Sequence, residues 1–175
     1  MGQSAPSGSP TGRIPSWQAD FSFTGYSLGA DIVARMTSDI AHGRGPIPAD
    51  RVGAVTLFAN PYHGDNGAVP ASITDPSSRG ALGQLPEGYG SLGPRVLEIC
   101  YPDDLVCSMP ERYRGLVGPA MSTNVLAGQI PSTQFRDLVN GLGVDSLGIV
   151  AGINAHARYG YAERREAADW IVAHA

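Results

Sequence analysis

The sequence predicts an α/β fold in which helices flank a parallel sheet. Three short apolar runs have the length and composition of strands, and the first is followed by a helix with one apolar face. The order strand, helix, strand, long loop, strand is typical of a parallel sheet. The chain has 175 residues, of which 42% are hydrophobic and 16% are charged, so it can form one folded domain.

The first strand and the first helix are predicted in residues 19–24 and 28–42. Aromatic and hydroxyl side chains alternate in Phe21-Ser22-Phe23-Thr24, which indicates the strand. The helix is indicated by apolar side chains at helical spacing, namely Leu28, Ile32, Val33, Met36 and Ile40. Residues 1–18 are rich in Gly, Ser and Pro and are expected to form a disordered leader, before a domain that we place at residues 19–175.

Two more strands are predicted in residues 52–59 and 95–100. The first is a nearly continuous apolar run, as in a strand that is buried on both faces. Between the two strands, residues 60–94 are rich in Gly, Pro and Ser and show no periodicity. We expect a long loop there, and loops of this length are usually functional or mobile.

The C-terminal part of the chain is expected to be helical. Residues 108–155 are interpreted as a helical insert, in which Ser132 or Thr133 can begin a helix. One face of that helix is apolar and carries Phe135, Leu138, Val139 and Leu142. A last helix is predicted from about residue 162 to residue 174.

The motif Gly25-Tyr26-Ser27-Leu28-Gly29 lies between the first strand and the first helix. At such a junction G-x-S-x-G is typical of a nucleophile elbow, a turn so tight that we expect both flanking positions to need glycine. The turn would present the Ser27 hydroxyl at a helix N-terminus, where the backbone N–H of Leu28 can donate to an oxyanion. The alternative is an ordinary glycine-rich turn, which a chain with 23 glycines also produces by chance.

A nucleophilic serine needs a base, and four histidines are candidates. In α/β-hydrolases the chain order is Ser, then Asp or Glu, then His, and the base lies just before the last helix. His156 has that position. His63, in the long loop, is the rival base. His42 and His174 fit the C-terminal ends of helices, where a histidine suits the helix dipole.

The carboxylate that orients the base should lie in the loop after a late strand. Asp103 and Asp104 directly follow the predicted strand 95–100. Adjacent aspartates are also common as turn formers, which is the alternative interpretation. Order and context together favour Ser27, Asp104 and His156 as the catalytic set.

The two cysteines, Cys100 and Cys107, stand seven residues apart. No further Cys or His lies nearby to complete a metal site, so a short disulfide loop is favoured, and disulfides are typical of oxidising compartments. Residues 1–15, however, lack the charged and apolar regions of a signal peptide. Either the thiols stay reduced, or the chain lacks its natural beginning.

The composition excludes several functions. The net charge is −4 and the isoelectric point is near 5.4, which argues against nucleic acid as a partner. All 12 basic residues are arginines, so no lysine is available for Schiff-base or Walker-type chemistry. No apolar run approaches 18 residues, so no transmembrane segment is expected. We also expect no metal and no cofactor.

Three segments match motifs of one known family. The run Cys100-Tyr101-Pro102-Asp103-Asp104-Leu105-Val106-Cys107 fits a pattern in which a disulfide closes a loop around a catalytic aspartate, here Asp104. Gly25-Tyr26-Ser27-Leu28-Gly29-Ala30 fits G-Y-S-Q-G-A, with Leu28 in place of glutamine, and His156-Ala157-Arg158-Tyr159 fits H-x-x-Y. The chain thus resembles the cutinase family over about residues 19–174, and residues 39–46 and 52–59 are similar to actinobacterial cutinase-like envelope lipases.

The resemblance implies an α/β-hydrolase fold and a serine esterase or lipase that hydrolyses carboxylic esters through an acyl-enzyme. It implies that Ser27, Asp104 and His156 are the catalytic residues and that Cys100 and Cys107 form a disulfide. It further implies a small-molecule, lipid or polyester-like ester as substrate, and a secreted or cell-envelope location.

Two departures leave alternatives open. The separation of 52 residues between Asp104 and His156 is longer than in compact fungal cutinases. In this length the chain resembles the cutinase-like lipases of mycolate-bearing bacteria or the phage lysin B esterases, so a mycolyl-arabinogalactan esterase is an alternative. The family also has several strands and helices before the elbow, where this chain has 24 residues. We therefore expect an N-terminally truncated domain with an exposed sheet edge for association, and an inactive fragment or binding module is the other alternative.

Overall fold

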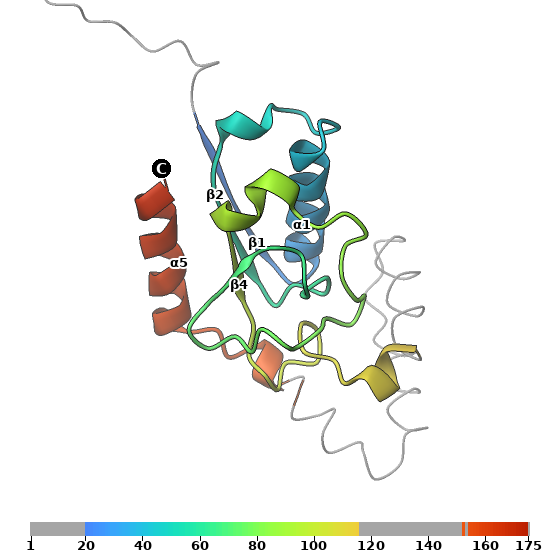
Figure 1. Ribbon diagram of the computed structural model, residues 1–175. Coiled ribbons are helices and arrows are strands. Elements are labelled where there is room, and N and C mark those ends of the chain that lie inside the picture. The colour runs from blue at the N-terminus through green and yellow to red at the C-terminus, as the bar shows by residue number, and fades with distance from the viewer. Residues whose placement is uncertain (1–19, 116–151, 153, 175) are drawn as a thin grey trace, which may run out of the picture.

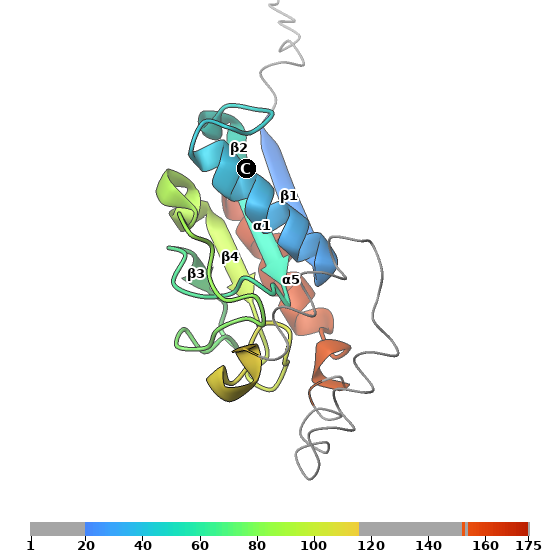
Figure 2. The ribbon, with the colours of Figure 1, turned by 90° about the vertical axis from the view of Figure 1, so that its right-hand side faces the viewer.

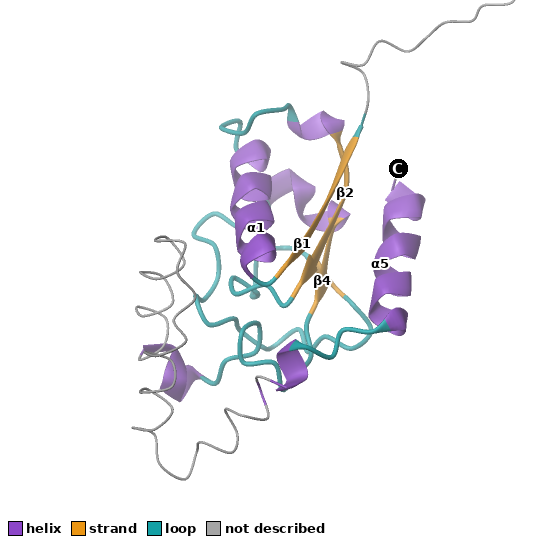
Figure 3. Cartoon of the chain, turned by 180° about the vertical axis from the view of Figure 1, so that it is seen from behind, coloured by secondary structure: helices purple, strands orange, loops and turns teal. Residues whose placement is uncertain are grey.

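The computed structural model describes residues 20–115, 152 and 154–174. These residues form a four-stranded sheet in the order β1-β2-β4-β3, and all of its strand pairs are parallel. Helix α1 packs on one face of the sheet and helix α5 on the other (Figures 1 and 3). The prediction of a parallel α/β sheet flanked by helices is confirmed.

The elements predicted from periodicity lie close to their expected bounds. The first strand is β1 (Phe21–Tyr26) and the helix after it is α1 (Leu28–Ala41). The second strand is β2 (Val52–Phe58), whose residues are all buried, as the continuous apolar run indicated. The strand before the cysteine loop is β4 (Val96–Ile99), and the last helix is α5 (Tyr161–His174).

The segment 60–94, expected to be a loop, contains two short elements. Strand β3 (Val69–Pro70) pairs with β4, and the 3₁₀ helix η3 (Gly90–Arg95) leads directly into β4. A two-residue strand that includes proline has no periodicity to detect, and proline is tolerated because β3 lies at the sheet edge. A second 3₁₀ helix, η2 (Ala49–Arg51), precedes β2.

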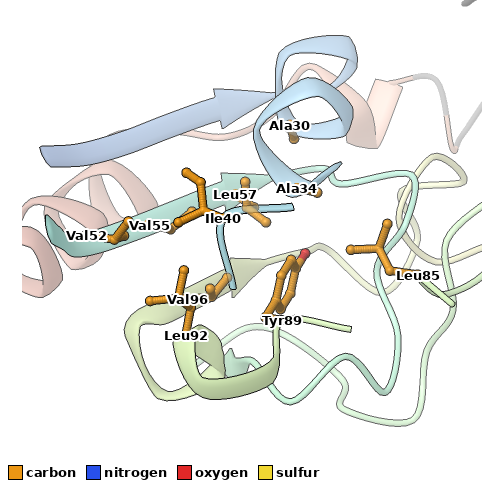
Figure 4. Close-up of a cluster of buried hydrophobic side chains, with 10 residues drawn as sticks. All are labelled: Ala30, Ala34, Ile40, Val52, Val55, Leu57, Leu85, Tyr89, Leu92 and Val96. Atoms are coloured by element: carbon orange, nitrogen blue, oxygen red, sulfur yellow. The ribbon is translucent and has the colours of Figure 1, made fainter. Parts of the chain in front are cut away.

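The main core lies between α1 and the sheet, and Figure 4 shows it. Side chains from α1, β2, β4 and the segment before β4 meet there. Ile40 of α1, Leu57 of β2 and Tyr89 are almost completely buried. A smaller cluster on the other face contains Ile99 of β4 and Ala167 of α5. The two helices thus each stabilise one face of the sheet by burying apolar surface.

Strand β1 is an outer strand of the described sheet, and Figure 2 shows it at the edge opposite β3. Within the described part of the chain it pairs with β2 alone. Phe21 and Tyr26 are 40% and 46% exposed. Association through this edge stays a prediction.

Two further predictions fall largely outside the described residues. The leader at 1–18 lies outside them, as does most of the helical insert at 108–155, including the helix expected near residues 132–142. Among the helices that are described, none has both the length and the hydropathy that a bilayer span requires.

Candidate active site

Ser27 occupies the tight turn between β1 and α1. Its backbone has φ 55° and ψ −118°, a region that side-chain-bearing residues rarely adopt. The Ser27 N–H donates to the Phe58 carbonyl at 2.9 Å, so the neighbouring strand β2 holds the turn in place. The strained conformation between a strand and a helix is the local geometry that the G-x-S-x-G motif predicts.

The two glycines of the motif are not equivalent. A Cβ atom on Gly25 would lie 2.6 Å from the Cα of Ala30 and from the carbonyl oxygen of Gly29, so only glycine fits there. At Gly29 an added Cβ meets no atom of the described residues within 4 Å, and the backbone has no positive φ. The expectation that both flanking positions need glycine was therefore wrong for Gly29, because α1 turns its Cβ direction there into open space.

The structure brings Ser27, His156 and Asp104 together in one hydrogen-bonded chain. Nε2 of His156 lies 2.9 Å from Oγ of Ser27. Nδ1 of the same ring lies 3.1 and 3.0 Å from the two carboxylate oxygens of Asp104. In the tautomer with the proton on Nδ1, the ring donates to the carboxylate and Nε2 accepts the serine proton. This arrangement can activate the serine hydroxyl as a nucleophile.

Asp104 is fixed by its own loop. Its side chain is completely buried, and Oδ1 accepts a hydrogen bond from the Val106 N–H at 2.9 Å. Cys100 and Cys107 form a disulfide that closes this loop, with their Cα atoms 5.9 Å apart, which confirms the predicted bond. The disulfide and the Val106 amide therefore keep the carboxylate directed at His156.

The adjacent Asp103 has a different partner. Its carboxylate accepts two hydrogen bonds from the Arg158 guanidinium, at 2.7 and 2.8 Å, and both side chains are about half exposed. The same guanidinium lies 4.8 Å from the centroid of the Tyr101 ring. Asp103 and Arg158 thus join the cysteine loop to the His156 segment at the surface, while Asp104 alone of the two faces the histidine.

Two tyrosines contact the site, Tyr26 and Tyr159, and the sequence motifs contain both without indicating a role for either. The Tyr26 ring stacks on the His156 imidazole with centroids 5.1 Å apart, and its hydroxyl donates to the His156 carbonyl. Burial, and then the charge of Asp104, raise the pKa of Tyr26. The Tyr159 hydroxyl donates to Oδ2 of Asp104 at 2.7 Å. The motif H-x-x-Y indicated that Tyr159 lies near His156, but the spacing of a motif does not show which atom the phenol contacts.

The predicted oxyanion donor, the N–H of Leu28, belongs to the first residue of α1. Backbone N–H groups in a first helical turn have no partner within the helix and lie at the positive end of the dipole. The Leu28 side chain is 41% exposed. The position suits an anion that develops beside Ser27, and the role itself stays a prediction.

The other histidines lie elsewhere. Nδ1 of His42, at the end of α1, lies 2.7 Å from the Ser38 carbonyl, and Nδ1 of His174, at the end of α5, lies 2.8 Å from the Trp170 carbonyl. Both therefore occupy helix C-terminal ends, as expected. His63 is buried beside β4, and its Nδ1 lies 3.5 Å from Oε2 of Glu98.

Glu98 is a buried carboxylate that the sequence analysis did not single out. Its Oε1 accepts hydrogen bonds from the Asn60 amide at 2.9 Å and from the Tyr89 hydroxyl at 2.8 Å. Within the residues that the structure describes, its Oε2 and both ring nitrogens of His63 have no hydrogen-bond partner. A cavity of about 120 Å³ lies against His63 and Glu98. Glu98 thus ties both ends of the segment between β2 and β4 to the middle of the sheet.

The chain is similar to a protein called "Carboxylesterase Culp6 homolog" from Corynebacterium glutamicum. The two are 31% identical over 110 residues, which cover 52% of this chain and 36% of that protein. The chain thus spans about a third of the length of the curated relative that it matches. No family model matches the sequence. The similarity connects the chain loosely to carboxylesterases, and the parallel α/β sheet is consistent with that connection.

Proposed function

We propose that the protein is a serine esterase that hydrolyses carboxylic esters. The observation that carries the proposal is the hydrogen-bonded chain from Ser27 through His156 to Asp104, at a strained turn between a strand and a helix. The similarity to a carboxylesterase supports the same reaction class. Each group is of the type that acyl transfer requires: a hydroxyl nucleophile, an imidazole base and a buried carboxylate.

In the first half-reaction His156 takes the Ser27 proton on Nε2 as Oγ attacks the ester carbonyl. Asp104 holds the ring in the tautomer that leaves Nε2 free and stabilises the imidazolium that forms. The tetrahedral intermediate then collapses, and the imidazolium donates its Nε2 proton to the departing alcohol. The products of this step are a free alcohol and an acyl ester on Ser27.

In the second half-reaction His156 acts as a base again and removes a proton from water. The water oxygen attacks the acyl carbonyl, and the carboxylic acid leaves as Ser27 recovers its proton from His156. In both steps the N–H of Leu28 donates to the oxyanion. A single donor of this kind contributes about 10²–10³-fold to turnover.

The surroundings of Ser27 favour esters with an apolar part, such as lipid or polyester-like substrates. Tyr26, Leu28 and Ile32 are 46%, 41% and 55% exposed, and two of them directly flank Ser27 in the chain. Burying such side chains against an acyl chain would add roughly 25 cal/mol per Å² of apolar surface. The disulfide suits an oxidising location, so we place the protein outside the cytoplasm, secreted or in the cell envelope.

The test combines covalent labelling with turnover. A fluorophosphonate probe should label the wild-type protein on Ser27, and short-chain p-nitrophenyl esters should be hydrolysed. Ser27→Ala should abolish both. The matched control is Ser22→Ala, on the exposed part of β1, which should keep both. A folded wild-type protein that neither reacts with the probe nor hydrolyses the esters would contradict the proposal and favour the alternative, an inactive fragment or a binding module.

A further inference from the structure

We infer that Tyr159 is a positioning residue for the proposed reaction, whose phenol fixes the Asp104 carboxylate and withdraws part of its charge from His156. The inference rests on the proposed function for its kinetic consequences. Tyr159 lies outside the Ser27, His156 and Asp104 chain and donates a hydrogen bond to Oδ2 of Asp104.

The Tyr159 hydroxyl is held from two sides. It donates to Oδ2 of Asp104 at 2.7 Å and accepts from the Tyr101 N–H at 3.2 Å. Oδ1 of the same carboxylate accepts from the Val106 N–H at 2.9 Å. Each carboxylate oxygen thus has one fixed donor besides the His156 ring, and rotation of the carboxylate would break both hydrogen bonds. Because Asp104 is completely buried, water cannot replace a lost donor easily.

The Tyr159 ring is packed so that the phenol cannot turn away. It lies edge-on to Phe58 at the end of β2 and to Tyr26 at the end of β1, with ring centroids 5.9 Å apart in both pairs. Sγ of Cys107 lies 3.5 Å from the hydroxyl. One side chain therefore joins the ends of two strands, the disulfide loop and the acid.

The phenol remains a donor throughout the working pH range. Burial, and then the negative charge of Asp104, raise the pKa of Tyr159 far above its ordinary value. The titratable groups that face it are Asp104, Tyr26 and Tyr101, and the pKa values of both other tyrosines are raised as well. No ionisation of Tyr159 or Tyr26 near neutral pH therefore removes the hydrogen bond.

The negative charge of the Asp104 carboxylate is shared among several hydrogen-bond donors, and this affects how strongly it attracts His156. A carboxylate that accepts from Tyr159 and Val106 attracts the imidazolium less strongly than one that faces His156 alone. Without the phenol, His156 would hold its proton to higher pH, and the carboxylate could rotate out of line. Both effects lower turnover, and neither removes a contact with substrate.

The test compares Tyr159→Phe with Tyr101→Phe. Tyr101 is a matched control because its ring packs against Tyr159, with centroids 5.1 Å apart, while its phenol donates to Glu163 instead. Tyr159→Phe should lower kcat about tenfold with KM unchanged, since it removes one hydrogen bond to a charged group. The acidic limb of its kcat/KM profile should move up by about half to one pH unit. Tyr101→Phe should change neither.

A second measurement needs no turnover. NMR of ¹⁵N-labelled histidine follows the His156 ring nitrogens through a pH titration, and Tyr159→Phe should raise the midpoint of that titration. 3-Fluorotyrosine at position 159, a stronger hydrogen-bond donor that keeps the ring, should lower it. The fluorinated variant also covers the case in which Tyr159→Phe does not fold.

The outcomes separate the two claims. If the wild type turns over ester but Tyr159→Phe matches it in kcat, in the pH profile and in the NMR midpoint, the inference is wrong. If the wild type neither turns over ester nor reacts with the probe, the proposed function fails, and the NMR midpoint alone decides the role of Tyr159. A midpoint that moves with the substitutions at position 159 supports the role, and one that does not overturns it.

Discussion

The described part of the chain contains two histidine–carboxylate pairs, and they differ in exposure, in geometry and in their other hydrogen-bond partners. In the pair His156–Asp104, Nδ1 lies 3.0–3.1 Å from the carboxylate oxygens and Nε2 lies 2.9 Å from a serine hydroxyl. In the pair His63–Glu98, Nδ1 lies 3.5 Å from the carboxylate, and neither ring nitrogen has a hydrogen-bond partner among the described residues. The His156 side chain is 23% exposed and that of His63 is 4% exposed.

For the proposed reaction a histidine beside a buried acid is not sufficient, because the base also needs a nitrogen that faces a nucleophile. His156 has one nitrogen for the acid and one for the nucleophile, and part of its ring reaches the surface where substrate can approach. Glu98 instead accepts hydrogen bonds from Asn60 and Tyr89, which come from the two ends of one long connection. In the proposed reaction the first pair moves a proton, whereas the second holds a loop against the sheet.

The largest expected effect separates the two histidines by activity. His156→Ala should lower kcat/KM by about 10⁴-fold, because the members of such a set act as a unit. His63→Ala should keep turnover within about threefold at a temperature where both variants are folded. Ester hydrolysis by purified variants, with folding checked by circular dichroism, measures this. If only the His63 variant lost activity, the base would be His63 and the assignment to His156 would be wrong.

The next effect separates the two pairs by stability. Glu98→Ala removes the acceptor of the buried Tyr89 hydroxyl and one of the two acceptors of the Asn60 amide, so it should lower the free energy of unfolding by about 3–5 kcal/mol. Glu98→Gln keeps an acceptor oxygen and should cost less. Urea denaturation measures both, with Glu87→Ala at the exposed Arg44 ion pair as the control that should hardly move the midpoint. A Glu98→Ala variant as stable as the control would mean that the carboxylate does not hold the loop.

A smaller effect concerns the loop that carries Asp104. Replacing both Cys100 and Cys107 by Ala opens a loop with a sequence separation of seven residues. In the chain-entropy model this should cost roughly 2–3 kcal/mol. Activity should fall as well, because the loop positions the acid, whereas Glu98→Gln should spare activity. The free energy of unfolding and kcat of the same preparation test the distinction. Full activity in the cysteine-free variant would show that the Val106 and Tyr159 hydrogen bonds position Asp104 without the disulfide.

The smallest expected effect concerns the exposed ion pair between Arg158 and Asp103, next to the His156–Asp104 pair. Arg158→Ala removes the ion pair with Asp103, and both side chains are about half exposed. Exposed pairs contribute only about 0.2–1 kcal/mol, so the unfolding midpoint should move slightly and kcat should change by less than about threefold. High salt should reproduce part of the effect in the wild type. A loss of activity comparable to that of His156→Ala would make the pair part of the site.

Much of the fold was predictable because its elements carry their own periodicity. The amphipathic pattern of residues 28–42 and the apolar run of residues 52–59 each need only neighbouring side chains to be detected. The order of strands and helices then indicated the parallel sheet. Strand β3 was missed because two residues cannot show a period. It is a strand because the long connection after β2 brings residues 69–70 alongside β4.

The same limit applies to the site. The spacing around Ser27, Asp104 and His156 indicated three side chains that the structure places within hydrogen-bonding distance. Glu98 gave no such signal, since one Glu in an apolar strand usually faces solvent, and its partners Asn60, His63 and Tyr89 come from distant positions. Gly25 has no room for a Cβ atom, whereas Gly29 has room for one. This difference depends on the direction in which α1 leaves the turn, which a sequence motif does not describe.

The candidate site joins positions that are far apart along the chain, and this separation has a consequence for folding kinetics. Ser27 and His156 are 129 residues apart, and Asp104 and His156 are 52 apart. Contacts between such distant positions form late, because loop-closure entropy opposes them until the sheet has formed. Local opening of the segment that carries His156 would separate base from nucleophile while the sheet stays folded. If the protein is the proposed esterase, its turnover therefore reports the completed tertiary structure, and we expect turnover to return on refolding only after the helical signal has recovered.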